Sequence, residues 1–210
     1  HHAVIRKALD YAVKMEYIPF NPAARIETPK KQKYIGDYYN QDELNQLFSV
    51  IKGDTAEVAI VLAAYYGLRR SEVLGIKWSA IDFNEKTICI KHTVCKTQID
   101  GEDVIIAKDR TKNKSSIRTL PLIPAIEKLL LETKKKQEVN RKKCKKAYCK
   151  EYLDYVCVDS MGVRLKPDYL TQHLQHILKK HNMKHIRFHD LRHSCASLLL
   201  ANGISLKEIQ

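Results

Sequence analysis

The chain lacks the long apolar runs of membrane proteins and contains few cysteines. No stretch approaches the roughly 20 consecutive apolar residues that span a bilayer, and the first residues show no signal-peptide pattern. We therefore expect a cytoplasmic protein without a membrane partner. Its six cysteines form no C-x-x-C pair, which favours free thiols over disulfides, and Cys144 and Cys149 are only a weak zinc signal.

Acidic residues are scarce relative to basic ones. The 210 residues include 37 Lys and Arg but only 24 Asp and Glu, a formal charge of +13, and 44% of the residues are hydrophobic. That content is enough for one sizeable core, or for a core and a fragment of a second domain. A strongly basic globular chain is typical of nucleic-acid-binding proteins, with an anionic membrane surface as the competing partner.

Apolar periodicity and one polar gap divide the chain into domains. Apolar residues recur at helical spacing over 1–16, and Asn21-Pro22 ends that helix because proline disfavours helix in the preceding residue. We predict the end of an N-terminal helical domain at 1–26, a polar linker at 27–39 and a second domain at 40–210. The uncapped helix at residue 1 and the capping box at 205–208 lead us to expect a sequence truncated at both ends.

The second domain is predicted to combine helices with a small sheet. Asn40 and Glu43 form a capping box, residues 58–66 are typical of a buried helix, and Gly67 is placed to end that helix in a left-handed conformation. Strand candidates are 87–94, 104–106, 117–120 and 155–158. Further helices are expected over 124–150, from Pro167 to about 181, and over 189–202. The predicted fold is α+β and mostly α, a helical domain with a small antiparallel sheet or hairpin on one edge.

The tetrad His189-Asp-Leu-Arg192 is the most informative motif. At spacing i, i+3 the two outer residues share one helix face, where a histidine can transfer a proton and an arginine can bind phosphate oxygens. His189 and His193 also have the i, i+4 spacing of zinc-binding helices, which leaves a zinc hydrolase as an alternative. Asp190 replaces the glutamate of that motif, and Arg192 would put a cation beside the metal. We therefore expect no metal or other cofactor.

Two earlier segments supply further candidate residues. Arg69 follows a buried apolar helix, and Glu72 could pair with it, either as a purely structural pair or as part of a site. Lys112 lies in the segment 108–118, where five basic residues accompany one acid. A lysine there could contact phosphate or protonate a leaving oxygen, and the alternative is a solvated loop.

Three motifs in order carry a resemblance to a known family. They are G-L-R-x-S-E from Gly67, K-x-K-S-S-x-R-T-L-P-L from Lys112, and H-D-L-R-H-S from His189. Over residues 40–210 the chain resembles the catalytic domain of tyrosine recombinases, the phage and transposon integrases, and most of all the integrases of conjugative transposons in Gram-positive bacteria. The first 26 residues look like the last helix of the core-binding domain of that family.

The resemblance implies a role for each matched position. Arg69 and Arg192 would bind the scissile phosphate, Lys112 would be the general acid, and His189 would transfer a proton or contact the phosphate. Lys112 precedes Asn-Lys-Ser-Ser where the family usually has Thr-x-x-Ser, so Lys114 remains an alternative. Glu72 and His193 would support the site. The residues expected to contact DNA are Lys114, Arg118, Tyr169, Thr171 and His173.

The nucleophilic tyrosine of the family follows the H-x-x-R motif, and none of the 11 tyrosines does so here. We therefore expect this chain to lack the nucleophile, to bind duplex DNA and to be inactive alone. The resemblance implies a bacterial recombinase that integrates or excises a mobile element through a 3′-phosphotyrosyl intermediate. It also implies a tetramer on DNA and a directionality factor as partners. A non-catalytic DNA-binding module is the alternative.

Overall fold

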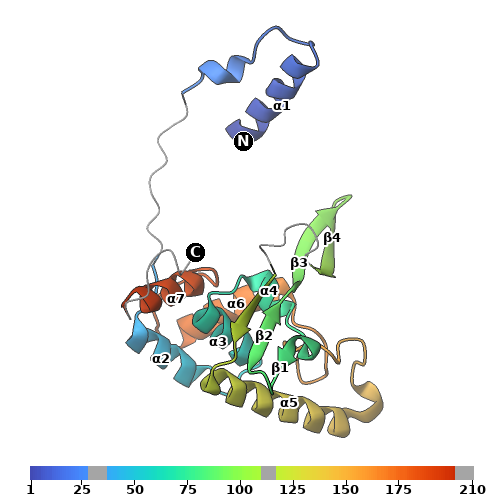
Figure 1. The fold of residues 1–210 in the computed structure, drawn as a ribbon, viewed down its shortest axis with the longest axis vertical. Helices are drawn as coiled ribbons and strands as arrows, with labels where there is room; N and C mark the ends of the chain where they lie inside the picture. Colours follow the sequence, from blue (N-terminus) through green and yellow to red (C-terminus); the bar gives the residue numbers. More distant parts are fainter. Residues whose placement is uncertain (28–36, 110–116, 202–210) are drawn as a thin grey trace. The chain divides into compact units, whose positions relative to one another are not determined.

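The computed structural model describes residues 1–27, 37–109 and 117–201, which belong to two compact units, His1–Ile35 and Gly36–Gln210 (Figure 1). In the first unit, α1 (His2–Lys14) precedes the short 3₁₀ helix η1 (Pro22–Arg25). The Asn21 side chain accepts a hydrogen bond from the Ala23 amide at 2.9 Å and donates one to the Asp10 carboxylate at 2.6 Å. These bonds fix η1 against α1.

The second unit is built around a buried helix. The helices in chain order are α2 (Gln41–Val50), α3 (Glu57–Tyr66), α4 (Arg70–Leu74), α5 (Pro124–Cys144), α6 (Pro167–Lys180) and α7 (Asp190–Ala201), with short 3₁₀ turns at Trp78–Ala80 and Lys145–Ala147. Every residue of α3 from Val58 to Ala64 is buried. The helices α2, α4, α5 and α7 contact it, and α5 lies along the lower edge of the view (Figure 1). In the described part of the chain, no helix is long and apolar enough to cross a membrane.

The strands form two small antiparallel sheets. One has the order β1-β2-β5, from β1 (Ile81–Asp82), β2 (Thr87–Ile90) and β5 (Arg118–Pro121). The other is a hairpin of β3 (His92–Ile99) and β4 (Glu102–Asp109), which projects from the unit (Figure 1). Asp100 and Gly101 form its turn with φ angles of 52° and 86°, the positive values that tight hairpin turns require.

Gly75, directly after α4, lets two backbones approach closely. A Cβ atom added there would lie 2.2 Å from the carbonyl oxygen of His92, far inside contact distance. The close approach joins the end of α4 to the first residue of β3. His92 is itself buried, and its ring nitrogens lie 2.6 Å from the Asp109 carboxylate and 2.9 Å from the Tyr155 hydroxyl. The base of the hairpin is therefore attached to the core.

The predicted fold class is confirmed, with helices and two small antiparallel sheets in the proportions of an α+β, mainly helical domain. The strand expected at 155–158 is reduced to two isolated bridges, Lys77 with Tyr155 and Val158 with Arg164. Residues 155–157 are instead buried as irregular chain in the core. The helix expected over 124–150 ends earlier, because Lys145 adopts a φ of 48°.

Candidate active site

The turn between α3 and α4 presents Arg69 at the surface. Gly67 ends α3 with a φ of 58°, and the buried Leu68 anchors the next step of the chain. Arg69 is extended, and its side chain is 52% exposed. Its guanidinium therefore remains accessible to a ligand while its backbone starts α4.

Glu72 is the buried centre of this turn. Its carboxylate accepts the Arg69 backbone N–H at 2.9 Å and the Arg69 Nη1 at 3.1 Å. From β5, Arg118 donates its Nη2 at 3.0 Å and its Nη1 at 3.4 Å to the two oxygens of the same carboxylate. Because the Glu72 side chain has no exposed surface, its charge depends on these donors. One buried anion thus holds two arginines that lie 49 positions apart in the sequence.

Arg192 reaches the same turn from α7. Its Nη1 donates to the carbonyl oxygen of Gly67, and its Cγ lies 3.5 Å from the position that a Cβ on Gly67 would occupy. One turn further along, the Cys195 thiol lies 3.3 Å from the Tyr65 carbonyl oxygen. The structure therefore brings Arg192 against the residue that lies two positions before Arg69.

His189 lies immediately before α7, next to His193. Their ring centroids are 5.5 Å apart with nearly perpendicular planes. The pKa of His189 is lowered, first by partial burial and then by the neighbouring His193 and Arg192. The imidazole is therefore neutral near pH 7 and can accept a proton.

Asp190 fixes the approach to α7 through its bonds to Arg187. Its buried carboxylate accepts hydrogen bonds from the Arg187 backbone amide at 2.7 Å and from the Arg187 Nε at 3.0 Å and Nη2 at 2.8 Å. Burial alone would raise the pKa of Asp190, but the bonds from Arg187 outweigh burial and hold it below its usual value. Over residues 1–27, 37–109 and 117–201, no group of three or more His, Cys, Asp or Glu side chains could hold a metal ion.

The predicted hairpin lysines, Lys112 and Lys114, lie outside the described residues, so their roles stay predictions. The described chain on either side is anchored, at Asp109 by His92 and at Arg118 by Glu72. Sequence reasoning assigned Arg118 to DNA and missed its contact with Glu72. No local signal could have indicated that pairing, because the two residues are 46 positions apart.

The predicted DNA-contacting residues of α6 lie together on one helix. The Tyr169 and His173 rings stack with centroids 4.9 Å apart, and Tyr169 is exposed. His173 also pairs with the Asp54 carboxylate at 2.9 Å, and the Thr171 hydroxyl accepts a bond from Arg70 at 2.6 Å. The polar atoms of Thr171 and His173 thus already have partners within the protein, and the contact of all three residues with DNA remains a prediction.

Comparison with solved structures identifies the fold. The integrase of transposon Tn1549 in complex with a circular intermediate DNA superposes with a TM-score of 0.78 at 18% identity, covering 100% of this chain and 68% of that one. A lambda integrase tetramer bound to a Holliday junction gives 0.61 at 16% identity, covering 100% of this chain and 55% of that one. The fold is therefore that of integrase catalytic domains.

The sequence identifies the family. The model of the Phage integrase family matches residues 38–210, and the chain belongs to that family. It is 26% identical over 197 residues to a tyrosine recombinase XerC-like protein of Caldanaerobacter subterraneus subsp. tengcongensis, covering 91% of this chain and 49% of the relative. It is 28% identical over 215 residues to the ICEBs1 integrase of Bacillus subtilis, covering 97% and 55%. The chain thus spans about half the length of these curated relatives.

Proposed function

We propose that this chain is the phosphate-binding part of a site-specific DNA recombinase that integrates or excises a mobile element. The observation that supports this most directly is the meeting of α7 with the α3–α4 turn. There Arg192 lies against Gly67, and Arg69, two residues after Gly67, is bound by the buried carboxylate of Glu72. Two arginines on rigid elements suit a scissile phosphate, whose non-bridging oxygens gain charge in the transition state.

The proposed reaction is a transesterification. A tyrosine oxygen forms a bond to phosphorus, the bond to the 5′ oxygen breaks, and a 3′-phosphotyrosyl ester conserves the energy for rejoining. Neutral His189 accepts the tyrosine proton, and Lys112 donates a proton to the leaving 5′ oxygen. In the order of the family motifs the tyrosine follows His189, and no tyrosine of these 210 residues does. The attacking tyrosine is therefore proposed to belong to a part of the recombinase outside these residues.

Duplex DNA is the proposed partner, bound mainly through phosphate contacts by a chain of charge +13. Assembly as a tetramer on DNA and control by a directionality factor belong to the same proposal. The lambda integrase relative was solved as a tetramer on a Holliday junction.

The test uses the recombinase that contains this chain and a nicked duplex carrying the junction of the element ends. Such a substrate traps the covalent intermediate, which is seen as a protein–DNA adduct on a denaturing gel. Arg69→Lys and Arg192→Lys should each abolish the adduct while leaving DNA retention within a few fold. If both variants form the adduct at the rate of the unaltered protein, the proposal is wrong. DNA retention without any adduct in the unaltered protein would indicate a non-catalytic DNA-binding module.

A further inference from the structure

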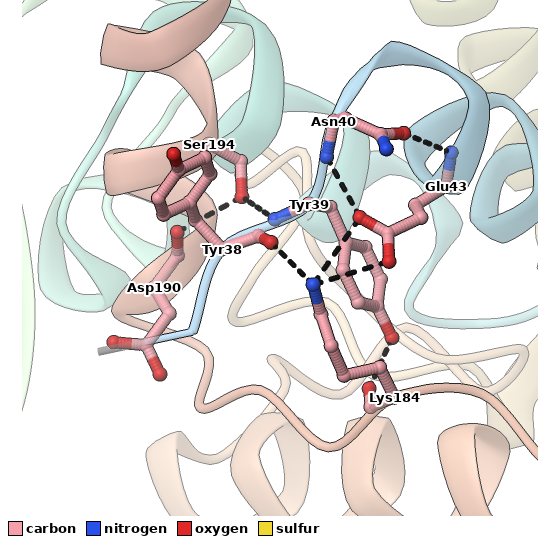
Figure 2. Close-up of polar contacts among 7 residues, drawn as sticks. All are labelled: Tyr38, Tyr39, Asn40, Glu43, Lys184, Asp190 and Ser194. Carbon is pink, nitrogen blue, oxygen red and sulfur yellow. Dashed lines mark hydrogen bonds and ion pairs between the residues drawn. The ribbon is translucent and has the colours of Figure 1, made fainter. Parts of the chain in front are cut away.

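A short segment before α2, residues 38–40, binds α7, the helix that carries Arg192. Residues 38–40 precede α2 and run past α7 (Figure 2). The Tyr39 backbone N–H donates to the Ser194 Oγ at 2.9 Å, and the Ser194 hydroxyl donates to the Asp190 carbonyl oxygen at 3.1 Å. Ser194 is fully buried, so its single hydroxyl joins two segments 155 positions apart.

Lys184 ties the same segment to the loop before α7. The Tyr39 hydroxyl donates to the Lys184 carbonyl oxygen, and the Lys184 Nζ donates to the Tyr38 carbonyl oxygen at 2.8 Å (Figure 2). The same ammonium pairs with Glu43 at 3.1 Å, and Glu43 accepts the Asn40 backbone N–H at 2.9 Å. The segment is therefore anchored both at the N-cap of α2 and at the loop that leads to His189. We call residues 38–40 with Lys184 and Ser194 the α7 clamp.

The clamp and the active site act on different sides of α7. Arg192 and Cys195 contact the carbonyl groups at the end of α3, whereas Ser194 faces Tyr39. Arg192 and Ser194 are two positions apart, a spacing that places side chains on different helix faces. The N-terminal half of α7 is thus held from two directions. Removing the bonds on one side frees the helix to shift relative to α3, and with it His189 and Arg192.

We propose that Ser194 and Tyr39 are positioning residues for catalysis, which set the placement of His189 and Arg192 through α7. The inference rests on the proposed function and adds two fully buried residues to those that would contact the phosphate. A displacement of about 1 Å at a reacting group can cost on the order of 100-fold in rate. Loss of the clamp should therefore slow DNA cleavage more than it weakens DNA binding.

The test compares Ser194→Ala, which removes both hydroxyl bonds, with Tyr39→Phe, which keeps the ring and removes only the bond to Lys184. Ser49→Ala is the matched control, because Ser49 is an exposed serine whose hydroxyl donates to the local Gln46 carbonyl. Each substitution is made in the recombinase that contains this chain. The two measurements are the single-turnover rate of adduct formation on the nicked duplex and the dissociation constant for that duplex.

Amide hydrogen exchange of residues 191–196 is measured on the same variants without DNA. We expect Ser194→Ala to slow adduct formation at least 10-fold without changing the affinity for DNA, and to speed hydrogen exchange in α7. Tyr39→Phe should change the rate and the exchange in the same directions but more weakly. Rates equal to the Ser49→Ala control, or a matched loss of rate and affinity, would overturn the inference. Unchanged hydrogen exchange in Ser194→Ala would also overturn the inference, whether or not the unaltered protein forms an adduct. A missing adduct in the unaltered protein would instead refute the proposed function.

Discussion

The buried carboxylate of Glu72 offers the sharpest test of how the site is held together. Glu72→Gln keeps the shape of the side chain but removes the charge that Arg69 and Arg118 share. The amide oxygen can still accept hydrogen bonds, but the NH₂ group that replaces the second oxygen would face N–H donors and could accept none of their bonds. In the variant, the guanidinium groups of Arg69 and Arg118 therefore lie beside a buried neutral amide instead of a carboxylate.

The expected loss of stability follows from burial. Removing one partner of a buried ion pair costs about 3–5 kcal/mol. Arg69 and Arg118 are 52% and 31% exposed, so water can hydrate them once the charge is lost. We therefore expect the lower end of the range, about 3 kcal/mol. With a urea slope of about 2 kcal/mol per molar, the unfolding midpoint should fall by about 1.5 M.

Tryptophan fluorescence gives the assay, because the chain has one tryptophan, Trp78, in the same unit as Glu72. Glu127→Gln is the matched control. Glu127 pairs with Lys86 at the surface, where a pair contributes at most about 1 kcal/mol. If Glu72→Gln lowers the midpoint no more than Glu127→Gln does, the carboxylate does not organise the site and this reasoning fails.

Three further predictions follow from other described residues. The folded state lowers the pKa of His189, so the unfolded chain takes up that proton first. Its contribution to stability is complete above a pH of about 6.5 and declines below it, and His189→Gln should flatten urea midpoints measured between pH 7.5 and 5.5. Gly75→Ala should destabilise the second unit by about 3 kcal/mol, the upper end of the range of about 1–3 kcal/mol for overpacking, because the added Cβ meets the His92 carbonyl. Unchanged thermal unfolding would refute this prediction. Burial raises the pKa of Cys157 to about 12, so this thiol should resist alkylation in native protein and react only with unfolding, whereas Cys144 is accessible; mass spectrometry after iodoacetamide distinguishes them.

Signals confined to a few residues predicted local structure well. Asn40 and Glu43 form the expected capping box, Gly67 ends α3 in the left-handed conformation, and α6 begins at Pro167. Each signal depends on backbone groups within one turn, so spacing alone reveals it. The segment at 155–157 was misjudged because a short buried apolar run has the same pattern in a strand and in irregular core chain.

The hairpin and the site depended on longer-range information. No turn was predicted at Asp100-Gly101, because β4 is exposed along most of its length and shows no clear alternation of apolar and polar residues. The pairing of Arg69 with Glu72 was predicted from their spacing of three. By contrast, Arg118 with Glu72 and Ser194 with Tyr39 join segments 46 and 155 positions apart, and no spacing rule reaches that far. Only the folded chain reveals these partners.

The β3–β4 hairpin has a tip that can change in length and a base that cannot. At its base, Gly75 and the buried His92 leave no room for an added atom, whereas at its tip Asp100 and Gly101 turn in solvent. Residue pairs inserted beside the tip would extend both strands in register without altering the base. The length of the β3–β4 hairpin can therefore be engineered while Arg69, Arg118 and Arg192 stay in place.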